Sequence, residues 1–576
     1  MAALESRWIP TGDVSAAAHG ASLVERVRLA RGYPADDRSV RILEQPMLAS
    51  LHPGRTLPGA TAVAERLEAA IRDGRRIAIY GDYDADGITA TAVLWRTIRA
   101  LRPDADLRWY VPDRFEEGYG LNEGALEQLA ADGVRVVVTV DCGVSAVGPA
   151  RRARELGLEL LVTDHHHADP DGIADAVAIA HPSLPGRDPA PFADLCGAAV
   201  AWKVACELAR CWCGGDRIAK VLNDALVACL PLVACGTVAD VMPLLDENRI
   251  FVACGLGSIQ STRIAGLRAL LDDSQLDRGK KVESSDVGFR IGPRLNVTGR
   301  LGHAAEAVEL LITEDPVRAR AIVRTVSEMN ERRKRMDREF FEQACLRIEH
   351  EGLAEAGAIV LADARWHEGV VGIVAQKVAE RYGRPAILMA IREDGTAKGS
   401  GRSVGGIDIL AAVRGAAGPL MQRGGGHAFA LGVTVAAGDV PEFARLVAAE
   451  CAARSGGRPA GPVRHYDLEI DPQELTSDAV AALDRLRPYG RGNPEPAFLL
   501  RGVRPVGGAR VFGGQGTHLE FTLPGAVRVV WWGGAEHAAR LAPGRTVDVI
   551  VRPELDTFRG NRGVQAILAD LRPTQA

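Results

Sequence analysis

The sequence predicts a mixed α/β protein of several domains, with a parallel sheet near its start and a small β-barrel at its end. Short, unbroken apolar strands alternate with helical segments between residues 76 and 180, which is typical of a parallel sheet covered on both faces. One long and highly charged helical stretch follows at 304–350. After residue 463, five or six short alternating strands indicate a barrel.

The chain of 576 residues is long enough for three or four domains of ordinary size. Residues 1–75 are expected to form a helical lead-in, and residues 76–303 the first α/β core. A connecting helix should occupy 304–350, before a second α/β domain at 351–455. The Gly/Pro-rich linker SGGRPAGP then precedes the barrel, which we expect at 463–573.

In the first α/β core, the expected strands are RRIAIY at 75–80, VRVVVTV at 134–140 and LELLVT at 158–163. The segment 88–101 has helical periodicity. Because helices connect these strands, the strands should run parallel and end at one edge of the sheet.

Composition excludes several classes of protein. The formal net charge of −5 argues against a tail-driven nucleic-acid binder, so contact with nucleic acid must come from local clusters of arginine and lysine. The first residues hold no apolar core of signal-peptide length, and Pro231 and Gly236 interrupt the longest apolar tract, 225–239. The ten cysteines lie mostly in apolar segments, as reduced cytosolic thiols do. We therefore expect a cytoplasmic protein without a membrane segment.

The strongest chemical signal is GDYDADGIT at 81–89, where Asp82, Asp84 and Asp86 come directly after a buried strand. Carboxylates this close together repel one another unless a multivalent cation neutralises them. The same residues could open a calcium-binding EF-hand loop. That alternative is disfavoured because the twelfth position is Val93 instead of glutamate, and because a strand precedes the loop.

Two further strands end in similar residues. Asp141 follows the second strand, and Asp164, His165 and His166 follow the third. A single aspartate after a strand is more often the N-cap of a helix, but agreement between three strand ends favours a shared site. Asp240 ends an apolar helix, where it either caps the helix or adds a further ligand.

These motifs run along most of the chain, together with YVPDRFEEGYGL, GPRLNVTGRLG, RWHEGVVGIVAQK, KGSGRS, GGGHAFALG and PYGRGNPEPAF. In this order they resemble the DHH superfamily of phosphoesterases, and most closely the RecJ family of single-strand-specific exonucleases. The resemblance implies a DHH domain, a long connecting helix, a DHH-associated substrate-binding domain and a C-terminal OB-like barrel.

The resemblance also implies two divalent cations, Mn²⁺ or Mg²⁺, and no protein nucleophile. The implied metal ligands are Asp84, Asp86, Asp141, His165 and Asp240. Asp141 would bridge the two cations, while Asp82 and His166 would complete the catalytic set as outer ligands or by orienting substrate or water. Imidazole is a softer donor than oxygen, which favours Mn²⁺ somewhat.

For the substrate, the resemblance points to two groups of phosphate contacts. The first is Arg114, Arg294, Asn296 and Arg300, and the second is Ser400, Arg402, Ser403 and His427. On the residues alone, Arg114 could lie in a polar loop with packed aromatic residues, and Arg294, Asn296 and Arg300 in a surface turn. The second group could lie in flexible glycine-rich turns.

Several aromatic and polar residues keep open roles. Trp366, His367 and Glu368 could serve structure or substrate. The barrel offers candidates for stacking on bases, namely His518, Phe521, Trp531, Trp532 and Phe558. Adjacent tryptophans on a strand face opposite ways, so at most one of Trp531 and Trp532 can stack without further arrangement.

The resemblance implies a monomeric exonuclease that degrades single-stranded DNA 5′→3′ to mononucleotides in DNA repair and recombination. Single-strand-binding protein and a recombination helicase are the expected partners. One alternative is a DHH phosphoesterase of short oligonucleotides or other small substrates, and another is a non-catalytic scaffold relative. Two departures from the family pattern, His181-Pro182 in place of Asn-Pro and the Val-Thr-Gly and His303 of the GPRLN motif, affect only the expected substrate contacts.

Overall fold

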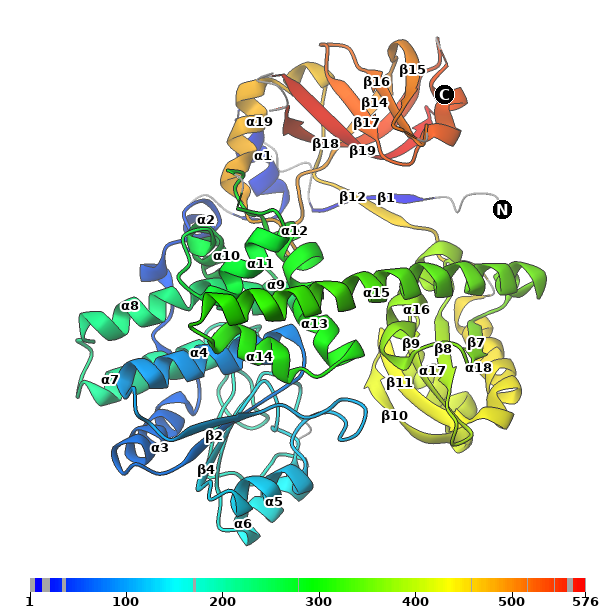
Figure 1. Ribbon diagram of the computed structural model, residues 1–576. Coiled ribbons are helices and arrows are strands. Elements are labelled where there is room, and N and C mark those ends of the chain that lie inside the picture. The colour runs from blue at the N-terminus through cyan, green and yellow to red at the C-terminus, as the bar shows by residue number, and fades with distance from the viewer. Residues whose placement is uncertain are drawn as a thin grey trace. The chain divides into compact units, whose positions relative to one another are not determined.

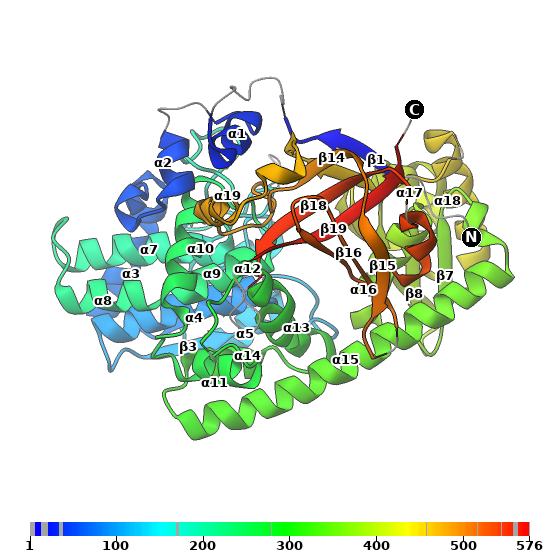
Figure 2. The same ribbon diagram turned by 90° about the horizontal axis from the view of Figure 1, so that it is seen from above.

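The computed structural model describes residues 6–12, 21–33, 38–168, 172–277, 279–456, 458–514, 516–542, 544–556 and 563–574. The chain divides into two compact units, drawn in Figures 1 and 2. The N-terminal unit comprises residues 33–330 and 482–495. The C-terminal unit comprises residues 1–32, 331–481 and 496–576.

A five-stranded parallel sheet forms the centre of the N-terminal unit, in the order β3-β2-β4-β5-β6. Its strands are β2 (Ile77–Gly81), β3 (Leu107–Tyr110), β4 (Val136–Val140), β5 (Glu159–Thr163) and β6 (Ala178–Ala180). The chain leaves β2 for one neighbour, β3, and then crosses to the other, β4. The C-terminal ends of β2 and β4 therefore flank a topological switch point, where ligands of such sheets bind.

Alternate strand residues enter two separate hydrophobic clusters, because successive side chains of a strand point to opposite faces. Ile79 and Val138 belong to the cluster shared with α3 (Ala60–Arg72), α4 (Ala85–Leu101) and α7 (Gly197–Trp212). The intervening residues pack with α5 (Glu123–Ala131) and α6 (Val147–Glu155) on the other face. Both faces of the sheet are thus covered, as the unbroken apolar strands predicted.

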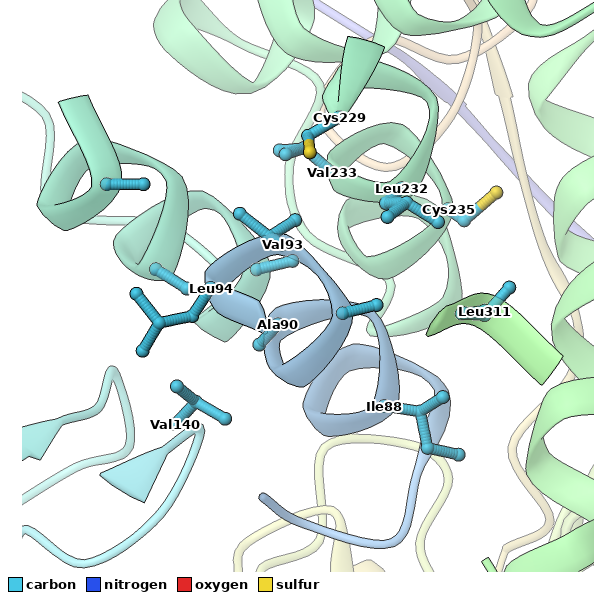
Figure 3. Packing of buried hydrophobic residues seen from close by; sticks show 14 of the residues in the cluster. Ile88, Ala90, Val93, Leu94, Val140, Cys229, Leu232, Val233, Cys235 and Leu311 are labelled. Carbon is cyan, nitrogen blue, oxygen red and sulfur yellow. The ribbon is translucent and has the colours of Figure 1, made fainter. Parts of the chain in front are cut away.

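Helix α4 is buried on nearly all sides, which fits its lack of a polar face. Figure 3 shows Val93 and Leu94 of this helix among apolar side chains of its neighbours, including Val140 at the end of β4. This packing fixes the start of α4, which carries Asp84 and Asp86, relative to the ends of the strands.

Helices α8 (Lys220–Ala228) and α9 (Leu230–Ala239) form a stretch that passes a length and composition test for a membrane span, with mean hydropathy 1.8. Sixty-one per cent of that window is buried inside the protein. Helix α9 packs against α4, α7 and α10 (Asp246–Ile259), so it has the environment of a core helix.

The remaining helices of the N-terminal unit are short. They are α2 (Arg38–Glu44), α11 (Ala265–Asp273), α12 (Ser284–Asp286), a π-helical turn at Val287–Ile291, α13 (Gly292–Leu301) and α14 (Ala305–Ile312). The segment 482–495 joins this unit although it comes late in the chain. Arg249, which is buried, donates hydrogen bonds to the carbonyl groups of Arg487 and Pro488 and holds that segment in place.

The expected helix at 304–350 is interrupted. Helix α14 ends at Ile312, and three residues separate it from α15 (Pro316–His350). Proline is favoured in the first turn of a helix, where its missing N–H costs nothing, so Pro316 starts a new helix. The 35 residues of α15 span about 50 Å.

The DHH-associated region holds a second sheet, in the order β10-β11-β9-β8-β7. Its strands are β7 (Ile359–Asp363), β8 (Ala386–Ile391), β9 (Thr396–Arg402), β10 (Met421–His427) and β11 (Ala430–Ala436). Its helices are α16 (Glu368–Tyr382), α17 (Ile409–Ala417) and α18 (Val440–Ser455). Only β7 and β8 pair in parallel.

The SGRS and GGGH motifs lie largely in strands, so their interpretation as flexible turns is wrong. Residues of β9 alternate between half-buried and buried positions, and glycines occupy two of the buried ones. A Cβ atom at Gly399 would lie 2.5 Å from Met389 Cγ, and one at Gly401 would lie 3.0 Å from Leu431 Cγ. These glycines let β9 lie close to its apolar neighbours.

The C-terminal region forms a seven-stranded sheet in the order β13-β14-β18-β19-β17-β16-β15. Its strands are β13 (Leu468–Glu469), β14 (Phe498–Val503), β15 (Val506–Phe512), β16 (His518–Thr522), β17 (Arg528–Trp531), β18 (Val547–Leu555) and β19 (Val564–Pro573). The long strands β18 and β19 lie side by side (Figure 2). Before this sheet, β1 (Arg7–Pro10) pairs in parallel with β12 (Val463–Tyr466).

Candidate metal centre

Polar residues follow four neighbouring strands of the parallel sheet in a single row. Gly81, Val140, Thr163 and Ala180 are paired in register as the last residues of β2, β4, β5 and β6. The next residues are Asp82, Asp141, Asp164 and His181. Pairing fixes these four positions side by side at the switch-point edge, as the sequence predicted for three of the strands.

Asp84 caps helix α4, so the N-cap alternative is realised at this residue. Its Oδ1 accepts hydrogen bonds from the N–H groups of Asp86 and Gly87, at 2.8 and 3.1 Å. Asp84 also lies with Asp82 and Asp141 in a group whose ligand atoms are all within 4.8 Å of one another. Capping therefore positions Asp84 without removing it from the acidic cluster.

Asp86 and Asp240 form a second group with His165. His165 Nε2 lies 3.8 Å from Asp86 Oδ2 and 3.7 Å from Asp240 Oδ2. The Asp86 carboxylate accepts hydrogen bonds from the N–H groups of Gly197 and Ala198, at the start of α7. Asp240 is the C-cap of α9.

Asp141 is shared between groups of potential ligands. It lies with Asp82 and Asp84 in one group, and with His165 and His166 in another. Its Oδ1 is 3.0 Å from His165 Nε2. The structure therefore brings all seven predicted catalytic residues together, and Asp141 and His165 each belong to two of the three groups.

Three features of the acidic cluster fit the binding of cations. Asp82 Oδ1 and Asp141 Oδ1 are buried, and neither makes a hydrogen bond of proper geometry. A buried carboxylate oxygen without such a bond is costly unless a cation neutralises it. Asp141 also adopts a positive φ of 64°, a strained conformation for a residue other than glycine. The mixture of carboxylates and imidazole suits Mn²⁺ or Mg²⁺.

The protonation behaviour of the cluster agrees with this fit. Burial raises the pKa of Asp82, Asp86 and Asp141, and the charge of Asp84 raises each of them further. Burial, together with Asp86 and Asp84, raises the pKa of Asp240 to about 8. The raised pKa values mean that, when no cation is bound, these carboxylates bind protons more readily than ordinary aspartates do.

Asp164 and His181 hold residues of the cluster in place through hydrogen bonds, a role that the sequence did not reveal. Asp164 is buried, and it accepts hydrogen bonds from Val144 N–H at 2.9 Å and His166 Nδ1 at 2.8 Å. Burial opposes its charge, but these bonds lower the pKa of Asp164 to about 2. Burial likewise opposes the charge of His166, but Asp164 raises the pKa of His166 to about 9. His181 Nδ1 accepts from Ser183 N–H, so Nε2 donates to the His166 carbonyl at 2.8 Å.

Two glycines allow helices to approach the cluster closely. A Cβ atom at Gly197 would lie 2.5 Å from Asp141 Oδ1, and one at Gly236 would overlap Asp86 Oδ1. Glycine is therefore needed at the first turn of α7 and within α9. Nothing in the local sequence marked these positions, because the contact is between segments far apart in the chain.

The predicted phosphate contacts of the N-terminal unit differ in how they are used. Arg114 lies in a loop after β3, with its guanidinium 5.2 Å from the centre of the Tyr83 ring. The GPRLN motif forms helix α13, so it is not a surface turn. Within it, Asn296 Oδ1 accepts from Ala85 N–H at 2.7 Å, beside the acidic cluster. Arg294 pairs with Asp273 at 3.0 Å and is mostly buried.

Arg300 lies near Tyr83, and Tyr119 lies against His166. Arg300 lies close enough to lower the pKa of Tyr83, although burial raises that pKa overall, to about 12. The Tyr119 hydroxyl is 3.1 Å from His166 Nε2, and Tyr119 as a residue is 54% exposed. Tyr119 therefore links the loop after β3 to the metal cluster.

In the DHH-associated region, the structure brings together only two of the four predicted contacts. Arg402 Nη1 donates to Ser400 Oγ at 2.8 Å on the face of β9 that packs against α16. Ser403 Oγ donates instead to the Ile407 carbonyl within its own loop. His427 is exposed at the end of β10, beside Phe429.

The WHEGV residues have structural partners. Trp366 is buried and donates to Gln343 of α15 at 3.0 Å. His367 caps α16 through Gly369 N–H, and Glu368 binds Lys398 at 3.0 Å and also Arg392. These contacts favour the structural alternative.

Comparison with known proteins agrees with the fold and the site. Family models match at residues 76–237 (DHH family, N-terminal domain), 355–453 (DHHA1 domain) and 466–570 (RecJ OB domain). The single-stranded-DNA-specific exonuclease RecJ of Bacillus subtilis is 34% identical over 556 residues, which cover 96% of this chain and 68% of that protein. The chain belongs to the RecJ family. The RecJ of Thermus thermophilus is 38% identical over 528 residues, covering 90% of this chain and 72% of that one.

Solved RecJ structures are similar to the whole chain. A crystal structure of Thermus thermophilus RecJ in complex with Mn²⁺ matches with a TM-score of 0.81 and 31% identity, covering 99% of this chain and 80% of that one. The same protein in complex with Mg²⁺ matches with a TM-score of 0.74. The predicted fold class is therefore confirmed, and the C-terminal sheet lies in the region that matches the RecJ OB domain.

Among the described residues of the RecJ OB region, one group of aromatic side chains is exposed. Trp532 is 58% exposed, and its ring centre lies 4.9 Å from that of His518 and 5.8 Å from that of Phe512. Trp531 stacks on His537 at 4.7 Å, and Phe521 is buried. Phe558 lies outside the described residues. Of the two tryptophans, Trp532 is the one available to stack on a base.

Proposed function

We propose that this protein is a metal-dependent exonuclease that degrades single-stranded DNA 5′→3′ to mononucleotides. One observation carries the proposal: aspartates and histidines from three strand ends and two helices meet in adjoining groups that share Asp141 and His165. Membership of the RecJ family supports the choice of substrate, since the named relatives are single-stranded-DNA-specific exonucleases.

The residues that would hold two divalent cations are Asp84, Asp86, Asp141, His165 and Asp240. When bound, such a pair of cations activates water as the nucleophile and stabilises charge on the phosphate during in-line displacement. Asp82 adds a buried carboxylate to the group around Asp141.

His166 has a separate role on the substrate side. Asp164 holds its Nδ1–H, which leaves Nε2 facing Tyr119 at the partly exposed side of the site. Burial opposes its charge, but the Asp164 carboxylate raises the pKa of His166, which favours a proton on Nε2. That N–H can donate a hydrogen bond to a phosphate oxygen and orient the scissile group.

The proposed phosphate contacts are Arg114, Asn296 and Arg300 in the N-terminal unit, with Arg294 positioning α13 through Asp273. Ser400, Arg402, Ser403 and His427 are the proposed contacts of the DHH-associated region. The exposed Trp532 group would stack on bases of the strand.

In the cell, we place the protein in the cytoplasm, as a monomer that acts in DNA repair and recombination with single-strand-binding protein and a recombination helicase. The proposed domain limits are 1–75, 76–303, 304–350, 351–455 and 463–573, with the helical connection beginning at Pro316.

The deciding experiment is a nuclease assay with Mn²⁺ or Mg²⁺ on long single-stranded DNA labelled at either end, on duplex DNA and on a dinucleotide. We expect 5′→3′ release of mononucleotides from the single strand alone. In Asp84→Ala and Asp141→Ala the rate should fall by about 10³-fold or more, since each removes a ligand of the proposed pair. Undiminished hydrolysis in either folded variant would refute the site, and preference for the dinucleotide would favour the small-substrate alternative.

A further inference from the structure

The C-terminal unit contains a cavity of about 690 Å³ that is lined by four arginines. Arg7 comes from β1, Arg384 follows α16, Arg454 lies in the last turn of α18, and Arg458 belongs to the linker after it. None of the other lining residues is acidic; they are mainly glycine, proline and alanine. Arginines from four separate segments therefore line the same cavity.

Two of the four charges have carboxylate partners. Arg384 is 1% exposed and lies 3.6 Å from Glu355, while Arg454 pairs with Glu450 at 2.8 Å on the same helix. Among the residues that the structure describes, Arg7 and Arg458 form no ion pair. Helices α16 and α18 end here, and each helix end contributes about half a negative charge. Positive charge is therefore in excess in the cavity.

The backbone segments around the cavity pack closely against one another. A Cβ atom at Gly405 would lie 2.7 Å from Ala460 Cβ, and both Gly405 and Gly406 have positive φ. Ala460 N–H donates to the Gly383 carbonyl at 2.8 Å, which ties the linker to the end of α16. Arg7 is fixed by its pairing with Val463. The arginines are thus held on ordered backbone instead of a free tail.

We propose that this cavity is a phosphate-binding site that takes the phosphate group of a nucleotide, either in a DNA strand or as a free mononucleotide. The phosphate group carries about one negative charge in a DNA strand and about −1.5 to −2 as a monoester at pH 7, so the excess positive charge of the cavity attracts it in either form. Arginine also presents paired N–H groups that fit phosphate oxygens. The site binds without hydrolysis, because its lining residues include no carboxylate or histidine that could hold a metal. The proposal goes beyond the nuclease function and does not depend on it.

The test uses the full-length protein in EDTA, so that hydrolysis plays no part. The variant is Arg7→Gln/Arg458→Gln, which removes the two unpaired charges and spares the buried Arg384. Arg414→Gln is the matched control, because Arg414 is an exposed arginine of α17 outside the cavity. Calorimetry measures the binding of inorganic phosphate and thymidine monophosphate, and fluorescence anisotropy measures the binding of a labelled oligothymidylate. Circular dichroism confirms that each variant is folded.

The two sources of phosphate give different results. If the site holds a DNA strand, the double variant binds the oligothymidylate about 10-fold more weakly, and the salt dependence of log K becomes shallower by about 1.4 for two lost phosphate contacts. If it holds a free nucleotide, only phosphate and thymidine monophosphate lose affinity. Either result supports the site. Equal binding of every probe by the wild type and the double variant, or an equal loss in Arg414→Gln, would overturn it.

Discussion

Asp164 shows how one residue outside the metal cluster controls a group inside it. It holds the backbone of the strand end through Val144 and the side chain of His166. In Asp164→Asn the amide oxygen can still accept from His166, but the amide nitrogen cannot accept from Val144 N–H, and the charge that favours protonated His166 is lost. Loss of such a supporting partner typically costs about 10–100-fold in activity. We expect kcat to fall by that factor and the alkaline limb of the pH–rate profile to move to lower pH.

The pH profile separates this role from a purely structural one. A structural defect lowers the rate at every pH, whereas loss of the Asp164 charge moves the pKa of His166 back toward its ordinary value. Asp175→Asn serves as the control, because Asp175 forms an exposed ion pair with Arg154 in the same unit. An unshifted profile in Asp164→Asn would contradict the assignment to His166.

Gly197 is the clearest test of steric design at the site. In Gly197→Ala the new methyl group would lie 2.5 Å from Asp141 Oδ1, so the carboxylate or the start of α7 must move. We expect Mn²⁺ binding, measured by calorimetry, to weaken about 10-fold or more while the far-ultraviolet circular dichroism is unchanged. Gly257→Ala is the control, since a Cβ atom there meets nothing within 4 Å. Unchanged Mn²⁺ affinity in Gly197→Ala would count against the packing argument.

Residue identity alone located the candidate ligands because polar residues directly after apolar strands are visible in the sequence. The supporting residues were not predictable in the same way. Gly236 looks like any glycine of an apolar helix, and its need appears only when α9 lies against Asp86. His181 was seen as a departure from the family pattern, yet its ring holds the His166 carbonyl.

At the level of elements, strands flanked by helices were predicted well, and glycine-rich strands were not. The apolar runs of β2, β4 and β5 fixed their type and approximate ends. In β9 and β10 the glycines suggested turns, because glycine weakens strand propensity. The structure overrides that propensity, since close packing against Met389 and Leu431 leaves no room for side chains at Gly399 and Gly401.

The two adjacent tryptophans of the barrel give an element-scale prediction. Trp532 is exposed beside His518, whereas Trp531 stacks on His537. Trp532→Ala should weaken oligothymidylate binding by about 1–3 kcal/mol, the value of one stacked base, with little change in Tm. Trp531→Ala should instead lower the free energy of unfolding by about 1–3 kcal/mol through lost packing. Fluorescence anisotropy in EDTA measures DNA binding by both variants, and thermal unfolding measures their stability. Weaker DNA binding in Trp531→Ala and lower stability in Trp532→Ala would contradict this assignment.

On the scale of the whole molecule, the order of segments along the chain does not match the compact units to which they belong. The PYGRGNPEPAF motif follows the linker, yet most of it belongs to the N-terminal unit. Leu244 lies four residues after Asp240. In the N-terminal unit its N–H donates to the Arg491 carbonyl at 2.7 Å. No local pattern reveals such a return of the chain, because it depends on contacts between residues more than 200 positions apart.

The placement of every proposed metal ligand in one unit leads to a prediction about unfolding. The pKa values of Asp82, Asp86, Asp141 and Asp240 are raised in the folded state, that of Asp240 to about 8. A carboxyl group with a raised folded pKa binds its proton more tightly when folded, so its contribution to stability is present at low pH. That contribution is lost as pH rises from about 4 toward 8. In EDTA, the N-terminal unit should therefore lose stability over this range.

Mn²⁺ should reverse that loss, because it competes with protons for the same oxygens. At a concentration 100 times its Kd, it would stabilise the N-terminal unit by about 2.7 kcal/mol, a rise in Tm of about 4 °C. Differential scanning calorimetry at pH 6 and pH 8 should show a larger Mn²⁺-induced shift at pH 8, confined to one of two transitions. In Asp141→Ala, which lacks the shared carboxylate, the shift should largely disappear. Equal Mn²⁺ shifts at both pH values would mean that these carboxylates are not the groups that bind the ion, since only ligands that must lose a proton couple its affinity to pH.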